Sequence, residues 1–149
     1  MKLDHSARID APVERVWAIV SDVPRAGRLV PGVGPVEPLG ADRYRGTLRV
    51  QIGPVRLDLA GDIEVTSRDE TARTAALRLD AADHRLGGAV RATMRLALTQ
   101  ATPSTTDIRI ETDAQVLGRI GELGEPIIRR KADRIVSELI ANLAREASS

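Results

Sequence analysis

The sequence contains no cysteine and almost no aromatic residues, with no Phe, one Trp and one Tyr in 149 residues. Without cysteine, disulfide bonds, thiolate metal ligands and cysteine nucleophiles are excluded. With so few rings, there is no stacking platform for nucleic-acid bases. Neither sign of charge dominates, since 22 Lys and Arg oppose 21 Asp and Glu, whereas duplex binding normally needs a concentrated basic face. We therefore expect no nucleic-acid partner.

Long apolar runs are also missing. The first ten residues, MKLDHSARID, carry charges where a signal peptide has an apolar stretch. No segment approaches the length that spans a membrane, so we expect a cytoplasmic protein. The chain has the length of one compact domain and shows no linker or repeat, which predicts a single domain over residues 1–149.

Strict alternation of apolar and polar residues occupies the middle of the chain, from residue 43 to residue 116. Period-two alternation with one polar face is typical of an antiparallel sheet that covers a core on one side. The short connections GP, SRDE, DHRLGG and ATPS indicate that the strands form a meander. The residues expected on the inner face are Tyr44, Gly46, Leu48, Val50 and Ile52; Val55, Leu57, Leu59, Ile63 and Val65; Ala75, Leu77 and Leu79; Ala92, Met94, Leu96 and Leu98; and Ile108, Ile110, Thr112, Ala114 and Val116.

Helical spacing appears on both sides of this region. The segment APVERVWAIVSD places Val13, Val16, Trp17 and Val20 on one stripe, and Pro12 suits a first helical turn. Near the C-terminus an apolar stripe from residue 127 to residue 143 keeps helical spacing over about five turns, which predicts one long amphipathic helix.

The predicted fold class is therefore α+β. A first strand is followed by a helix and by a short helix or loop, then by about six further strands, and the long last helix covers the apolar face of the sheet. A bent sheet that grips a helix usually leaves a hollow, and the inner positions here are aliphatic with almost no aromatic rings. Either the core is tightly collapsed or a ligand supplies the missing volume.

The segment RLVPGVGPVEPLG, residues 28–40, is rich in glycine and proline. Pro31, Pro35 and Pro38 lack the backbone N–H groups that a phosphate-binding loop uses. Two interpretations remain, a structural turn or the apolar rim of a cavity formed by Leu29, Val30, Pro31 and Val33.

Three stretches together carry a resemblance to a known family. They are APVERVWAIVSDVPRAGRLVPGV, RYRGTLRVQIGPVRLDLAGDIEV and LGRIGELGEPIIRRKADRIVSEL. They resemble the CoxG family of carbon monoxide dehydrogenase subunits, within the START-like (SRPBCC) superfamily. The resemblance implies a helix-grip fold, in which a curved antiparallel sheet of about seven strands wraps around the long C-terminal helix, with two short helices after the first strand. It also implies a large apolar pocket and no metal or flavin cofactor.

The function that the resemblance implies is non-catalytic binding and carriage of a lipophilic small molecule. The expected ligand is a quinone, carried in support of a molybdenum hydroxylase of the carbon monoxide dehydrogenase type. The partners considered are therefore the lipophilic small molecule, such an enzyme and, transiently, the inner face of the membrane. Two alternatives stay open: an assembly factor for the enzyme that binds no ligand, and an enzyme of the polyketide cyclase type.

The pocket is expected between the last helix and the sheet. The predicted ligand-binding residues are Leu29, Tyr44, Leu48, Leu57, Leu59, Leu79, Met94, Leu96, Ile110, Ile120, Gly121, Gly124, Ile127 and Ile128. No catalytic and no metal-binding residue is predicted.

The glycines at 118, 121 and 124 leave two interpretations open. If the last helix already includes them, Gly121 and Gly124 share its apolar stripe and leave space for a ligand, and Pro126 is a kink. If they form a loop, the helix begins at Pro126.

Two polar side chains, Lys131 and Tyr44, are candidates for a role at the site. Tyr44, inward on its strand, either meets a ligand oxygen or is satisfied by the backbone. Lys131 lies at the edge of the helical stripe, either directed outward or donating to a ligand carbonyl. His5 and His84, the two histidines, are expected to be exposed and without a functional role.

Overall fold

The structure is a computed structural model that describes residues 1–148, and its centre is one antiparallel sheet in the strand order β1-β7-β6-β5-β4-β3-β2. The strands are β1 (Lys2–Ile9), β2 (Glu37–Gly40), β3 (Arg43–Ile52), β4 (Val55–Asp69), β5 (Thr74–Asp83), β6 (Gly88–Thr102) and β7 (Thr105–Gly118). The helices are α1 (Val13–Val20), α2 (Val23–Gly27), the 3-10 helix η1 (Arg119–Leu123) and α3 (Glu125–Ser148). The α+β class, the seven strands and the long last helix are confirmed.

Strands β2 to β7 form the predicted meander, and β1 pairs with β7 at the far edge. One predicted connection was misplaced. The turn expected at SRDE lies further along, because β4 continues to Asp69 and the chain reverses over residues 70–73. The Asp69 side chain fixes that turn, since its Oδ1 accepts hydrogen bonds from the backbone N–H groups of Thr71 and Ala72 at 3.0 and 2.9 Å.

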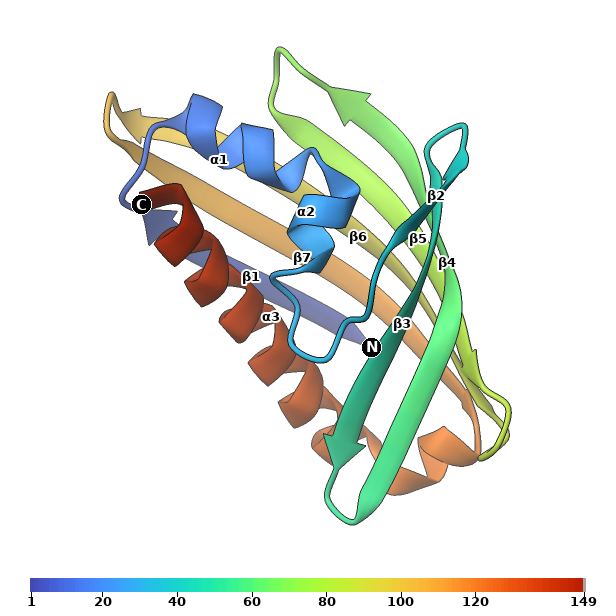
Figure 1. Cartoon of the computed structure of the whole chain (residues 1–149). Coiled ribbons are helices and arrows are strands. Elements are labelled where there is room, and N and C mark those ends of the chain that lie inside the picture. The colour runs from blue at the N-terminus through green and yellow to red at the C-terminus, as the bar shows by residue number, and fades with distance from the viewer. Residues whose placement is uncertain (149) are drawn as a thin grey trace.

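Helices α1, α2 and α3 all lie on the concave side of the curved sheet, and α3 runs along β1 (Figure 1). Two long-range contacts fix this placement. The Arg129 guanidinium donates to the Lys2 carbonyl at 2.8 Å, and Asp133 Oδ1 lies 3.1 Å from His5 Nε2. On its other side α3 meets the segment after α2, where the Asn142 amide donates to the Leu29 carbonyl at 2.8 Å. The helix therefore bridges from β1 to the chain that covers β3.

Helix α1 closes one end of the concave side. Its apolar stripe is buried as predicted at Val13, Val16 and Trp17, with Ile19 in addition. The Trp17 indole donates to Glu70 Oε2 at 2.5 Å, which ties the helix to the turn between β4 and β5. Pro12 does not lie inside the first turn. It is the N-cap residue, with extended backbone angles, so the helix begins one residue later.

The proline-rich segment 28–40 follows the free edge of β3. Gly32 and Gly34 exchange backbone hydrogen bonds with Arg49 and Thr47, and Val33 forms a bridge with Leu48. Gly32 is required there, because a Cβ atom would collide with the Arg49 carbonyl oxygen and φ is +85°. Its last residues form β2, so the segment shields the edge of the sheet.

The glycine-rich stretch before α3 is a loop and a 3-10 turn. Gly124 has φ +90°, which ends η1 and separates it from the helix. Helix α3 starts at Glu125, and Pro126 is its second residue rather than a kink. The alternative in which the helix includes the glycines is therefore wrong.

Candidate functional site

The concave face of the sheet carries two separate clusters of packed apolar side chains. The first joins β1, β6, β7, α1 and the C-terminal half of α3, and includes Ile9, Trp17, Leu98, Ile108 and Leu143. The second joins β3, β4 and η1, with Val50, Ile52, Leu57, Leu59 and Ile120. Because the clusters lie at opposite ends of the curved sheet, the middle of the concave face is held by neither.

Between the clusters runs a set of inward side chains that we call the central band. Its members are partly exposed and belong to neither cluster, although each sits at an inward position of its strand. In the register of the sheet they form two neighbouring rows, with Tyr44 opposite Ile63, Ile63 opposite Leu79, and Leu77 opposite Val65. The central band consists of Tyr44, Ile63, Val65, Leu77, Leu79, Ala92 and Ala114.

Two of these positions are small. Ala92 lies opposite Leu79 on one side and Ala114 on the other. A methyl side chain fills less space than a leucine such as Leu79 in the same row. An aliphatic surface that stays partly exposed inside the fold is what a binding site for an apolar molecule requires.

The fourteen predicted ligand-binding residues fall into different environments. Tyr44 and Leu79 lie in the central band. Leu29, Met94, Leu96 and Ile110 belong to the first cluster or pack against it, whereas Leu48, Leu57, Leu59 and Ile120 belong to the second or pack against it. Ile128 is partly buried, whereas Ile127 is 46% exposed on the outer side of α3. Gly121 and Gly124 precede that helix.

A pocket of about 220 Å³ lies at one end of the central band. It opens where β7 runs on beyond the start of β1, and it shares Ala114 with the band. Its lining residues are Met1, Ala114, Gln115, Val116, Gly121, Glu125 and Ile128. Two predicted residues, Gly121 and Ile128, therefore meet at this opening.

The segment after α2, residues 28–40, was considered as a structural turn or as the apolar rim of a cavity. Leu29 is buried in the first cluster, and its carbonyl accepts a hydrogen bond from Asn142. Val33 lines a half-open pocket of about 520 Å³ with Leu48 and Leu59, but also with the exposed, charged Arg49 and Asp58. The segment is thus a structural strap along β3, and its role as the rim of a ligand cavity stays a prediction.

Polar groups on the concave face of the described sheet are few, and one of them, His5, was predicted wrongly. His5 is not exposed: it occupies an inward position of β1, its side chain is 13% exposed, and Nε2 lies 3.1 Å from Asp133 Oδ1. Thr112, which the alternation places inward, is 8% exposed. Within residues 1–148, neither its Oγ1 nor Nδ1 of His5 has a hydrogen-bond partner.

Two further polar residues, Lys131 and Tyr44, were predicted near the site. Lys131 is partly buried and makes no ion pair or hydrogen bond among the residues described. Tyr44 is partly exposed on the inner face, opposite Ile63 in the register. His84, which was not predicted near the site, is exposed in the turn between β5 and β6, as expected.

Asp83 is a buried carboxylate whose role is structural. Its two oxygens accept backbone hydrogen bonds from Asp58 at 2.8 Å and from Leu86 at 3.0 Å. These bonds lower the pKa of Asp83 from its ordinary value, against the opposing effect of burial. The side chain is fully used in holding the turn between β5 and β6.

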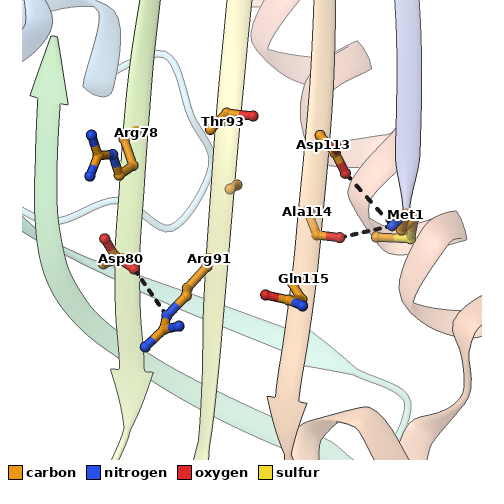
Figure 2. A pocket seen from close by; sticks show the side chains of 9 residues that line it. Met1, Arg78, Asp80, Arg91, Thr93, Asp113, Ala114 and Gln115 are labelled. Atoms are coloured by element: carbon orange, nitrogen blue, oxygen red, sulfur yellow. Dashed lines mark hydrogen bonds and ion pairs between the residues drawn. The ribbon is translucent and has the colours of Figure 1, made fainter. Parts of the chain in front are cut away.

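The convex face of the sheet has the opposite character. Figure 2 shows the residues around a hollow on this face, which has a volume of about 850 Å³ and is open to solvent. There Asp80 lies 3.4 Å from Arg91, and the N-terminal ammonium lies 3.9 Å from Asp113. Cross-strand ion pairs of this kind continue along the face. On β1 and β7, hydrogen bonds from Arg109 and Arg8 lower the pKa of Asp4 and Asp107 respectively. These charges pair with one another, which fits a solvated face better than an apolar site.

The curved sheet closed by α3 is the fold of the START superfamily. A conserved protein from Geobacillus kaustophilus has the same fold with a TM-score of 0.90 and 22% identity, covering 99% of this chain and 95% of that chain. A START superfamily protein from Mycobacterium smegmatis follows with a TM-score of 0.77 and 16% identity, covering 99% and 97%. The Zhui aromatase/cyclase from Streptomyces sp. R1128 has a TM-score of 0.73 and 16% identity, covering 99% and 93%.

The sequence also shows to which family within this superfamily the chain belongs. Residues 6–148 match the CoxG family of carbon monoxide dehydrogenase subunits, and the chain belongs to this family. No curated protein matches the sequence. Among the helices of residues 1–148, none combines the length and apolar character needed to cross a bilayer.

Proposed function

We propose that the protein is a non-catalytic carrier of a lipophilic small molecule, and that this molecule is a quinone used by a molybdenum hydroxylase of the carbon monoxide dehydrogenase type. The central band is the observation that carries the proposal. Its aliphatic side chains are inward yet partly exposed, and they lie between two clusters that are packed without them. Membership of the CoxG family supports the choice of enzyme partner.

The energetic argument concerns the apolar surface left uncovered. Burying apolar surface is favourable by about 25 cal/mol for each Å², so partly exposed aliphatic side chains inside a fold forgo stabilisation. A bound apolar molecule recovers it by covering Ile63, Leu77 and Leu79. A carrier also needs to release its ligand, and we place the exit at the pocket that shares Ala114 with the central band.

Solvent extraction tests the proposal directly. Protein purified under gentle conditions is extracted with organic solvent, and the extract is analysed by mass spectrometry. We expect a lipophilic compound in fixed ratio to the protein, and uptake of the apolar probe 1-methylnaphthalene by protein that has been stripped. A stripped protein that takes up no apolar probe would contradict carriage and favour an assembly factor.

The cyclase alternative draws on the fold shared with the aromatase/cyclase Zhui and on the polar atoms of His5 and Thr112 on the concave face. An enzyme converts its ligand, whereas a carrier returns it unchanged. Incubating stripped protein with the extracted compound and repeating the mass analysis separates the two. An unchanged mass and retention time support carriage, and a new product supports catalysis.

A further inference from the structure

On the concave face, two buried side-chain atoms lack a hydrogen-bond partner among residues 1–148, and they belong to paired strands. They are Nδ1 of His5 on β1 and Oγ1 of Thr112 on β7. His5 is opposite Ile110 in the register and Thr112 is opposite Leu3, so the two residues are diagonal neighbours on the same face. Diagonal positions are about 7–8 Å apart at the backbone, which is within reach of a long ring such as imidazole.

The position of Thr112 makes the missing partner informative. The inward residues opposite it, Leu3 and Met94, are apolar, and the next inward residue along its own strand is Ala114 of the central band. A buried hydroxyl without a partner is destabilising, and valine would have the same shape without that cost. Thr106, on the same strand, shows the usual arrangement, since its buried hydroxyl donates to the Ala11 carbonyl at 2.8 Å.

The contact with Asp133 decides what His5 can offer. Nε2 of His5 lies 3.1 Å from Asp133 Oδ1, so this side of the ring already faces a carboxylate and Nδ1 is the nitrogen left for a ligand. The Thr112 hydroxyl can both donate and accept a hydrogen bond. The pair therefore presents one ring nitrogen and one hydroxyl at the edge of an apolar surface.

We infer that His5 and Thr112 form a polar subsite for a hydroxyl group at one end of an otherwise apolar ligand. A single ligand hydroxyl can satisfy both atoms, because it both donates and accepts a hydrogen bond, as Thr112 Oγ1 does. A methyl group in the same place satisfies neither atom. The inference rests on the proposed function and specifies it, since it gives the apolar ligand a hydroxyl group at one end.

Two probes of matched shape test the subsite. The hydroxyl compound 1-naphthol and its isostere 1-methylnaphthalene are titrated into stripped protein by calorimetry. We expect wild type to bind 1-naphthol at least tenfold more tightly. In Thr112→Val that preference falls to threefold or less, while the affinity for 1-methylnaphthalene stays within twofold of wild type.

Thr93→Val is the matched control, because Thr93 is exposed on the convex face of neighbouring β6. It should leave both affinities and their ratio unchanged. His5→Leu removes Nδ1 and should also abolish the preference, but it breaks the contact with Asp133 as well, so this variant can fail to fold. In that event the ¹⁵N resonance of His5 Nδ1 in wild type decides, and it should move on addition of 1-naphthol and not of 1-methylnaphthalene.

Equal affinities of wild type for the two probes would overturn the subsite and leave the carrier proposal standing. An equal loss of both affinities in Thr112→Val would also overturn it, because the residue would then have only a structural role. If neither probe binds wild type, the carrier proposal and the subsite both fall.

Discussion

Filling the central band should stabilise the empty protein and expel its ligand. Ala92 is the position of choice, because it is inward on β6, partly exposed, and lies opposite Leu79 and Ala114. Leucine adds three carbons there. At about 0.8 kcal/mol for each buried methylene, the gain is about 2 kcal/mol, reduced by about 0.5–1 kcal/mol of side-chain entropy. We expect Ala92→Leu to raise the free energy of unfolding by about 1–2 kcal/mol.

The melting temperature and the affinity for an apolar probe are measured on the same sample. A gain of this size raises the melting temperature by roughly 2–8 °C for a chain of this length. The added side chain occupies ligand space, so the affinity for 1-methylnaphthalene should fall at least tenfold, which is about 1.4 kcal/mol.

Ala147→Leu is the matched control for this experiment. Ala147 is 0% exposed within the first cluster, where three added carbons have no space. Overpacking should therefore cost about 1–3 kcal/mol, with no loss of affinity per folded molecule. If Ala92→Leu destabilises the protein as Ala147→Leu does and the probe still binds, the middle of the sheet is solidly packed and the reasoning is refuted.

Three further experiments test other parts of the structure. Gly124→Ala should lower the free energy of unfolding by about 1–2 kcal/mol in a urea melt, because Gly124 has φ +90°. Gly121→Ala is the control and should be nearly neutral, because a Cβ atom has ordinary space there. Similar losses of stability in both variants would contradict the role of φ. Asp83→Asn should lower stability at pH 7. Because the folded-state pKa of Asp83 is lowered, its contribution is present above the ordinary carboxyl value of about 3.9 and disappears as the pH falls through the folded-state value. The difference from wild type should therefore shrink in acid, and a constant difference would show that charge is irrelevant. Leu143→Ala should cost about 2–5 kcal/mol in the same melt because Leu143 is 1% exposed, while Ile127→Ala on the outer side of α3 should stay within about 0.5 kcal/mol.

Much of the fold could be read from local patterns. Alternation from Arg43 to Val116 identified the long strands and assigned each side chain to a face, and the stripe beginning near Ile127 identified α3. These patterns depend on the pleat of a strand and the pitch of a helix, which are local properties of the backbone. For the same reason the sequence identified Thr112 as inward without showing that its hydroxyl lacks a partner.

The glycines before α3 show where local patterns stop. Gly121 and Gly124 fit a helical stripe by spacing alone, yet Gly124 ends the 3-10 turn with φ +90°. A glycine has no side chain, so spacing cannot distinguish a gap on a helix face from a residue chosen for its backbone freedom. The backbone conformation that leads into α3 could be determined only from the tertiary structure.

Coverage of the concave face was decided only in three dimensions. Leu57 and Leu79 look alike in sequence, since both are inward leucines of alternating strands, but Leu57 is packed in the second cluster and Leu79 lies in the central band. His5 was expected to be exposed and instead pairs with Asp133, which is distant in sequence. Alternation predicts on which face of the sheet a side chain lies. Whether that side chain is covered depends on where α3 packs against the sheet. That packing is set by contacts between residues far apart in the chain, and no local period encodes it.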